Sequence, residues 1–498
     1  MNLTNQRAKS KGGVFVVVQQ VFILAIHFLQ IVLFSRLLSP SDYGIAAMAG
    51  TIFTMANVFK DFGFSASAIQ TKELRKQDSD NLFWIGLLVA AAIAGTIIFL
   101  SPLLGWFFKQ PIVTRLVMLM GVTYLVAALG NQPTALAQRD FQFKPLAISG
   151  MAAKGIGFLS GYCLALGGFG PWSIAWMHLV ESVMGSTFGF IISGYRPGRI
   201  ANLSDTTSHF KFGALMTASG LMSFLSRNID KILIGRLYGA EALGIYTRAH
   251  GMIIFPFTGL LAGFTRFNLA SLSRLVDKGQ QYQSYVLFVL QVYMLVAACI
   301  VVPSVVLADE IVEILMGKQW ASVSPIFVIM APYTWYQIIS YLCNVSLISK
   351  GRMTQLATVH FWNCIISTAA IVIASPFGLL GLAFSFALGG MSLQLLMFLY
   401  IVAREKTIDI GPFLKVASIN IICALGVAFF VDYCIDPYLK TTETWCRICI
   451  LTTVTIFLLC LSLLFQESGR LILRHLTACI PRLLVKRSVP VPHGKEVE

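Results

Sequence analysis

Two short polar stretches of this sequence, 200 residues apart, resemble each other and decide how the chain is organised. The first is "SRLLSPSDYGI" at residues 35–45, and the second is "GRLYGAEALGI" at residues 235–245. Around them six positions match without a gap, including one arginine and one glycine in each copy. Each stretch lies between two long apolar runs. The chain is therefore expected to contain two related halves.

The composition of the chain points to a membrane protein. Of its 498 residues, 57% are hydrophobic and only 12% are charged, and its mean hydropathy is +0.77. An ordinary soluble domain has about 25% charged residues. No single water-soluble core could hold so much apolar surface, so the sequence predicts a polytopic, all-α membrane protein.

Windows of about 20 residues predict fourteen membrane-spanning helices. The first follows a basic start and is interpreted as a retained span, because no small-residue cleavage site follows it. A helix satisfies its own backbone polar groups in hydrocarbon, so each run can cross the bilayer. The expected spans are 13–34, 45–66, 82–104, 113–136, 146–167, 172–194, 212–234, 247–270, 284–307, 324–348, 354–374, 378–402, 413–431 and 446–465.

The positions of lysine and arginine support this number of spans. With a cytoplasmic N-terminus, the cytoplasmic segments and the tail from 466 carry 24 Lys and Arg residues. The opposite loops carry five, which are Arg36, Lys109, Arg236, Lys318 and Lys440. Such an asymmetry is the usual mark of cytoplasmic loops. It predicts that both termini are cytoplasmic, and it argues against nucleic-acid binding, because the basic residues form no single patch.

The repeat predicts how the spans are grouped. Both copies join the first and second helices of a half on the outer side, and "FGPWSIA" (169–175) is echoed weakly by "FGLLGLA" (377–383). An even number of spans separates the copies, so the halves are parallel repeats. We expect an N-terminal lobe over 1–200 (spans 1–6) and a C-terminal lobe over 201–410 (spans 7–12). Spans 13 and 14 over 411–465 and a basic cytoplasmic tail over 466–498 follow.

Few charged residues remain inside the spans, and a charge there costs several kcal/mol unless it is paired or faces water. Lys154 in the fifth span and His178 and Glu181 in the sixth are near mid-depth. In the seventh span, Arg227 shares a helix face with Asp230 and Lys231. We expect these side chains to line a cavity of net positive character. Trp335 and Tyr336, well inside the tenth span, are candidate partners for sugars in that cavity.

Other polar residues within spans have a structural interpretation. The basic residues Lys60, Arg248 and Arg266 are read as ion pairs or as side chains that reach the headgroups. The lone histidines His27, His250 and His360 are read as satisfied structural residues.

Several segments resemble polysaccharide transporters of the colanic-acid-exporter (Wzx-like) type, in the multidrug/oligosaccharidyl-lipid/polysaccharide exporter superfamily. They are "VFKDFGFSASAIQTKELRKQDSDNLFWI" (58–85), "PTALAQRDFQFKPLA" (133–147), "NIDKILIGRLYGAEALGIYTRAH" (228–250) and "MGKQWASVSPIF" (316–327). The resemblance implies a flippase of the bacterial inner membrane. It would move undecaprenyl-diphosphate-linked repeat units to the periplasmic leaflet for exopolysaccharide, capsule or O-antigen synthesis. Positions that match the family pattern, and are expected to shape the fold, are Asp61, Gly63, Gln70, Asp230 and Gly244.

Three other functions are alternatives to a flippase. A cation-coupled multidrug exporter of the same superfamily is the nearest alternative, although the first span contains no Asp or Glu and two helices follow the twelfth. A polymerase or ligase would need a large outer loop with catalytic residues, and a scaffold would not need charges at mid-depth. No nucleotide-binding motif is present, and no cofactor or metal is expected. The expected partners are the lipid-linked oligosaccharide, membrane lipids, and a polymerase or other pathway proteins.

Overall fold

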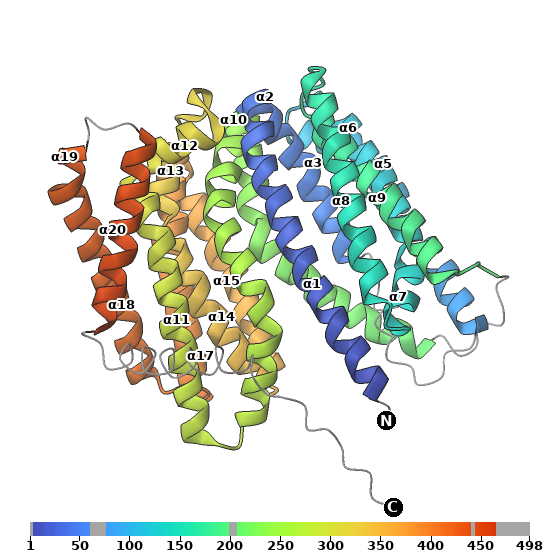
Figure 1. Cartoon of the computed structure of the whole chain (residues 1–498). Helices are drawn as coiled ribbons and strands as arrows, with labels where there is room; N and C mark the ends of the chain where they lie inside the picture. The colour runs from blue at the N-terminus through green and yellow to red at the C-terminus, as the bar shows by residue number, and fades with distance from the viewer. Residues whose placement is uncertain (1–2, 60–75, 199–206, 440–443, 465–498) are drawn as a thin grey trace, which may run out of the picture. The chain divides into compact units, whose positions relative to one another are not determined.

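The structure is a computed structural model that describes residues 3–59, 76–198, 207–439 and 444–464. Every regular element in these residues is helical (Figure 1). The residues Lys60, Asp61, Gly63 and Gln70 and the tail from 466 lie outside the described ranges, and so does the side chain of Arg266.

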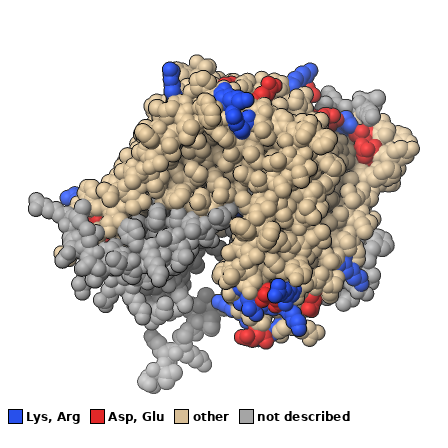
Figure 2. All heavy atoms as spheres, turned by 180° about the vertical axis from the view of Figure 1, so that it is seen from behind, with Lys and Arg blue, Asp and Glu red and all other residues tan. Residues whose placement is uncertain are grey.

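Eight helical stretches in the described ranges are long and apolar enough to cross a membrane. Many large apolar side chains on them are exposed, such as Leu88 (73%), Phe99 (82%) and Trp106 (70%) on one helix, as expected for surfaces that face lipid. On the face shown in Figure 2, the charged side chains gather near the upper and lower edges. The prediction of an all-helical polytopic membrane protein is confirmed. The eight stretches are Val17–Leu37, Lys76–Phe107, Pro111–Arg139, Trp172–Ser193, Gly279–Val306, Val323–Ser349, Met353–Arg404 and Ile410–Leu439.

Each of the fourteen expected spans falls, over its described part, on a helix or on a run of consecutive helical segments. The side of the membrane on which the termini lie stays a prediction. In chain order the helices concerned are α1 (Leu3–Leu29), α3 (Pro40–Val58), α5 (Lys76–Phe107), α6 (Pro111–Leu129) with α7 (Asn131–Arg139), α8 (Phe143–Leu166), α9 (Trp172–Ser193), α10 (Thr207–Leu275), α11 (Gly279–Val306), α13 (Val323–Met330) with α14 (Tyr333–Ser349), α15 (Met353–Ala374), α16 (Gly378–Phe384) with α17 (Met391–Arg404), α18 (Ile410–Phe430) and α20 (Thr444–Leu464).

The long α10 is two spans joined at Gly239, the position equivalent to Ser39 in the first copy of the repeat. Gly239 has φ 84° and ψ −171°, a conformation that is essentially restricted to glycine. In the first copy the break is made differently. Ser39 caps the N-terminus of α3 through a reciprocal pair of hydrogen bonds with Asp42, and Pro40 occupies the first helical position. Two different local solutions thus start the second helix of each half at the same place.

The weaker echo also has a common structure. Gly170, just before α9, has φ 54°, and Gly378, which begins α16, has φ 72°. Each follows a phenylalanine in the repeated sequence. Both glycines take a left-handed φ in the turn that starts a helix, which other residues rarely adopt.

The two copies of the repeat pack directly on each other through their glycines. A Cβ atom on Gly44 of α3 would lie 1.6 Å from the Ala240 carbonyl oxygen, and one on Gly244 of α10 would lie 1.9 Å from the Pro40 carbonyl oxygen. Neither position therefore has room for a side chain. Small residues let helix backbones approach closely where no hydrophobic force drives them together. We call this contact the glycine crossing.

The arginine of each copy caps a helix of the other expected half. Arg36 donates from Nη2 to the Ile314 carbonyl (2.9 Å), and Arg236 donates from Nη1 to the Phe107 carbonyl (2.8 Å). Both carbonyls belong to the last turn of a helix, α12 (Ala308–Met316) and α5, where backbone acceptors lack partners inside the helix. Trp320 adds a hydrogen bond from Nε1 to the Ser35 carbonyl (2.7 Å).

Contacts divide the chain into two compact units. One comprises residues 1–267, 308–333 and 352–398, and the other comprises 268–307, 334–351 and 399–498. Both copies of the repeat belong to the first unit. The expected lobes over 1–200 and 201–410 stay a prediction.

In the second unit, α18 and α20 pack against α11. A reciprocal pair of amide hydrogen bonds joins Gln291 of α11 to Asn420 of α18, both at 3.0 Å. Arg447 of α20 donates from Nε to the Asp436 carboxylate (2.7 Å). These buried polar side chains therefore satisfy each other, which matters most where no water is present.

The glycine crossing gives a stability prediction. Replacing Gly44 by alanine places a methyl group where the Ala240 carbonyl stands, so the helices must separate, and we expect a large loss of monodisperse protein and a lower thermal midpoint. Gly50→Ala in the same helix is the control, because nothing lies within 4 Å of its added Cβ. Size-exclusion chromatography and thermal denaturation of the full chain in detergent measure both. Equal behaviour of the two variants would contradict the crossing.

Candidate functional site

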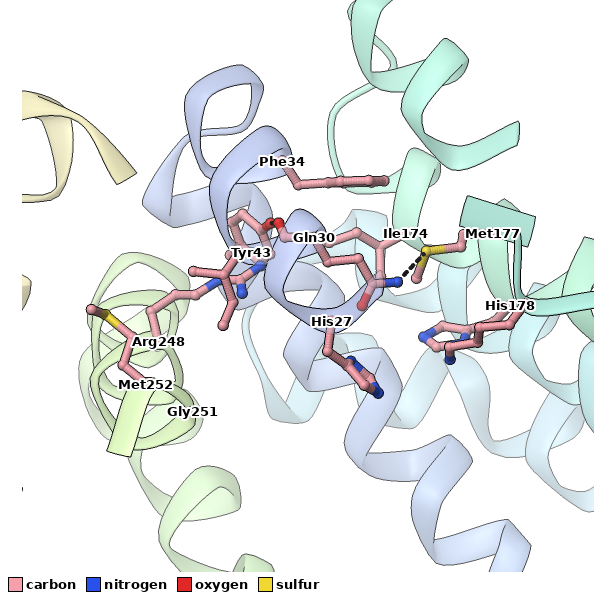
Figure 3. A pocket seen from close by; sticks show the side chains of 12 residues that line it. His27, Gln30, Phe34, Tyr43, Ile174, Met177, His178, Arg248, Gly251 and Met252 are labelled. Atoms are coloured by element: carbon pink, nitrogen blue, oxygen red, sulfur yellow. Dashed lines mark hydrogen bonds between the residues drawn. The ribbon is translucent and has the colours of Figure 1, made fainter. Parts of the chain in front are cut away.

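A cavity of about 310 Å³ lies within the first unit, among helices from both expected halves. Its polar lining comes from α1, α3, α8, α9 and the second part of α10, and apolar side chains such as Phe34 and Met177 complete the wall (Figure 3). Four of its six polar side chains are cationic or become so on protonation. We call it the cationic cavity and define it by His27, Gln30, Tyr43, Lys154, His178 and Arg248.

Lys154 of α8 forms an ion pair with Glu181 of α9. Its Nζ lies 3.1 Å from each carboxylate oxygen, and His178 Nδ1 lies 3.9 Å from the nearer of them. The pair is half-buried. Glycines on α8 bring the two helices together, since a Cβ on Gly157 would lie 3.0 Å from the Met177 carbonyl oxygen. The Lys154 charge is therefore largely compensated within the protein.

Arg248 provides the opposite wall of the cationic cavity. Its guanidinium carbon lies 3.4 Å from the centre of the Tyr43 ring, a cation–π contact between α10 and α3 (Figure 3). Among the side chains that the structure describes, no carboxylate lies within ion-pair distance of Arg248. In contrast to Lys154, Arg248 contributes a positive charge that this part of the protein leaves uncompensated.

A second cavity, of about 1090 Å³, adjoins the first. Lys154 and His178 line both cavities, and Glu181 lines the second. The other polar lining residues carry amide or hydroxyl groups and come from α1, α3, α7, α8 and α9. We call it the polar cavity and define it by Gln19, Asn57, Asn131, Thr134, Gln138, Ser149, Ser182 and Ser186 together with Lys154, His178 and Glu181.

The structure brings together one of the two expected charge groups. Lys154, His178 and Glu181 meet at the junction of the cavities, whereas Arg227, Asp230 and Lys231 line neither. Asp230 is buried and accepts a hydrogen bond from Tyr246 (2.7 Å), and Lys231 donates to Asn228 (3.0 Å). The partners of Asp230 and Lys231 are therefore uncharged side chains. Arg227 is exposed.

The remaining candidates lie elsewhere. Trp335 and Tyr336 are on α14 in the second unit, where Trp335 is buried. Gly244 forms half of the glycine crossing, in agreement with the structural role expected for it.

Sequence reasoning assigned structural roles to two residues of the cationic cavity, Arg248 and His27. For Arg248 a signal was available. It lies four residues after Gly244, so both occupy one face of the helix. Because Gly244 contacts α3, that face had to place Arg248 beside α3 one turn further along. For His27 the sequence offers no comparable signal.

The sequence pattern of one protein family, described as polysaccharide biosynthesis protein, matches residues 33–325, which is more than half of the chain. The chain belongs to this family. The match agrees with the Wzx-type resemblance of the sequence, since one relative described next is itself a Wzx protein. The resemblance inferred from residues 58–85 and the other quoted segments is confirmed.

Characterised relatives support the assignment along most of the chain. The lipopolysaccharide biosynthesis protein WzxC of Escherichia coli is 21% identical over 384 residues, covering 76% of this chain and 77% of that protein. The teichuronic acid biosynthesis protein TuaB of Bacillus subtilis is 22% identical and covers 85% and 89%. The succinoglycan biosynthesis transport protein ExoT of Rhizobium meliloti is 22% identical and covers 83% and 84%.

Solved structures share the fold. The lipid II flippase MurJ in an inward closed conformation superposes with a TM-score of 0.70 at 14% identity, covering 90% of this chain and 97% of that one. An inward-facing multidrug transporter of the MATE family gives 0.62 at 14% identity, covering 78% and 94%. The chain is thus a multi-pass polysaccharide biosynthesis transport protein with a fold shared by flippases and drug exporters.

The Lys154–Glu181 pair gives a second prediction. Lys154→Met or Glu181→Gln alone leaves one half-buried group without its partner, which costs on the order of 1–3 kcal/mol and should lower the thermal midpoint. The exchange Lys154→Glu with Glu181→Lys restores the pair and should recover most of that midpoint. Thermal denaturation of the three purified variants measures this. An exchanged variant that is no more stable than the single variants would argue against a stabilising pair.

Proposed function

We propose that this protein flips undecaprenyl-diphosphate-linked oligosaccharide repeat units across the bacterial inner membrane. The units would move from the cytoplasmic to the periplasmic leaflet, where they would be polymerised into exopolysaccharide, capsule or O-antigen. The family and the relatives named for polysaccharide biosynthesis support this class of cargo.

The cationic cavity is the observation that carries the proposal. A diphosphate esterified at both ends carries two negative charges at neutral pH, and a group with this charge is stable at membrane depth only beside cations. Arg248 supplies a guanidinium that forms no ion pair with any described carboxylate and is a good geometric match for phosphate oxygens. Lys154 stands across the same cavity, where it could exchange Glu181 for a phosphate oxygen. The prenyl chain would stay in the lipid.

The proposed mechanism is alternating access. The glycine crossing and the Arg36 and Arg236 caps join the expected halves at one end of the helices, which the charge distribution predicts to be the outer end. In this arrangement the cargo head would enter from the inner side. Release would require those contacts to part while contacts at the inner end form. An ion gradient or the removal of product by polymerisation would drive the cycle.

The alternative is a cation-coupled multidrug exporter, whose fold this chain shares. The two functions differ in what accumulates when the protein is absent. Deletion of the gene should cause short lipid-linked oligosaccharide to accumulate in the inner leaflet, with polymer lost and drug sensitivity unchanged. Drug sensitivity without accumulated lipid-linked oligosaccharide would favour the exporter instead.

The cationic cavity gives a third prediction. We expect Lys154→Met and Arg248→Met each to reduce surface polymer by tenfold or more in cells that depend on the variant, because the cavity loses a cation for the diphosphate. Immunoblotting of membranes measures the amount of each variant, and polymer is compared per amount of protein, because Lys154→Met is also expected to be less stable. Lys318→Met is the control, since the Lys318 side chain is 90% exposed and pairs with the surface residue Glu313. Normal polymer in both cavity variants would contradict the proposal.

A further inference from the structure

We infer that the polar cavity is a binding site for uncharged sugars of the cargo head, and that the diphosphate lies beside it in the cationic cavity. This inference rests on the proposed function and adds the chemical class of sugar and its place in the protein. It is carried by the lining of the polar cavity and by the way the two cavities share residues.

The lining of the polar cavity suits hydroxyl-rich rings. Four carboxamides line it, from Gln19, Asn57, Asn131 and Gln138. A carboxamide offers both a donor and an acceptor, and a sugar hydroxyl needs both. Gly150 leaves room for one of these groups, because a Cβ on Gly150 would lie 2.3 Å from Gln19 Nε2. Gln19, Asn57 and Asn131 lie within expected spans, where polar groups are costly unless a ligand or water satisfies them.

The charges of the polar cavity favour neutral sugars over acidic ones. Its charged lining residues are Lys154 and Glu181, and these pair with each other at 3.1 Å. Apart from His178, the described part of the lining has no net charge. A uronate carboxylate in this cavity would find no unpaired lysine or arginine among these residues and would face Glu181. Neutral hydroxyl groups incur no such penalty.

The residues that line both cavities indicate where each part of the cargo lies. The cationic cavity alone is lined by Arg248 and Tyr43, and the polar cavity alone is lined by the four carboxamides named above. Both cavities are lined by Lys154 and His178. A phosphate near Lys154 and Arg248 would thus place the sugar attached to it at the junction. There Phe53, whose ring stacks on that of His178 with centroids 6.0 Å apart, offers an apolar surface for one face of that sugar.

The size of the polar cavity agrees with more than one sugar. Its volume of about 1090 Å³ lies just above the ~300–1,000 Å³ usual for small-molecule sites. The cationic cavity, at about 310 Å³, lies at the lower end. The division matches a compact diphosphate joined to a larger oligosaccharide.

Binding of three lipid probes to the full chain in nanodiscs tests the inference. The probes are undecaprenyl diphosphate without sugar, a lipid-linked oligosaccharide of neutral sugars, and one that contains a uronate. Native mass spectrometry or thermophoresis measures the affinities. We expect the neutral probe to bind at least tenfold more tightly than the sugar-free lipid. The uronate probe should bind at least fivefold more weakly than the neutral one.

Variants separate the two cavities. Gln19→Leu with Gln138→Leu should lose most of the advantage given by neutral sugars, while affinity for the sugar-free lipid stays within twofold and shows that the variant is folded. Arg248→Met should weaken both probes. Gln20→Leu, next to Gln19 but outside the lining, should change neither.

Two results would overturn the inference while leaving the proposed function intact. One is an amide variant that binds the neutral probe as well as the original protein does. The other is a uronate probe that binds as tightly as the neutral one. If the unaltered protein binds none of the three lipids, the proposed function itself fails.

Discussion

The rest of the first unit depends on the backbone contact between α3 and α10 at the glycine crossing. Tyr43 precedes Gly44, and Arg248 lies one helical turn after Gly244. Because the two helix backbones are in contact, these two side chains lie close together. The guanidinium carbon of Arg248 lies 3.4 Å from the centre of the Tyr43 ring. The contact that joins the halves therefore also builds one wall of the cationic cavity. A side chain at either glycine would separate the helices and open this wall.

Four basic residues of the first unit are in three different electrostatic situations. Arg36 and Arg236 complete helix ends by donating to carbonyl oxygens, and Lys154 is neutralised by Glu181. Arg248 rests on an aromatic face, which stabilises a cation without removing its net charge. A phosphate would therefore be drawn first toward Arg248. Lys154 could bind the same phosphate only by leaving its ion pair with Glu181. Its contribution therefore depends on the anion that binds.

The sequence predicts structural features that depend on the residues of a single helix. Hydropathy located the spans, and the repeat located Gly44 and Gly244. Lys154 and Glu181 were chosen for mid-depth charge, and the structure brings them together because α8 and α9 are consecutive and pack closely. Arg227, Asp230 and Lys231 share a helix face in sequence, yet their partners include Tyr246, sixteen residues from Asp230 and beyond the break at Gly239. Helical periodicity shows which residues share a face, but not which helix that face meets. The position of Arg248 against Tyr43 could not be predicted for this reason.

The chemistry of the contacts at the repeated stretches bears on how the halves could part. Carbonyl oxygens, not carboxylates, accept the Arg36 and Arg236 hydrogen bonds, and Arg36 is exposed. A hydrogen bond with a charged donor adds roughly 1.5–3 kcal/mol, because water can replace either partner. Breaking a buried ion pair by stranding one charge would cost about 3–5 kcal/mol. The two halves are thus joined by a close steric fit at the glycines and by polar contacts that water can take over. Such a junction is well defined when closed and inexpensive to open, and alternating access requires both properties.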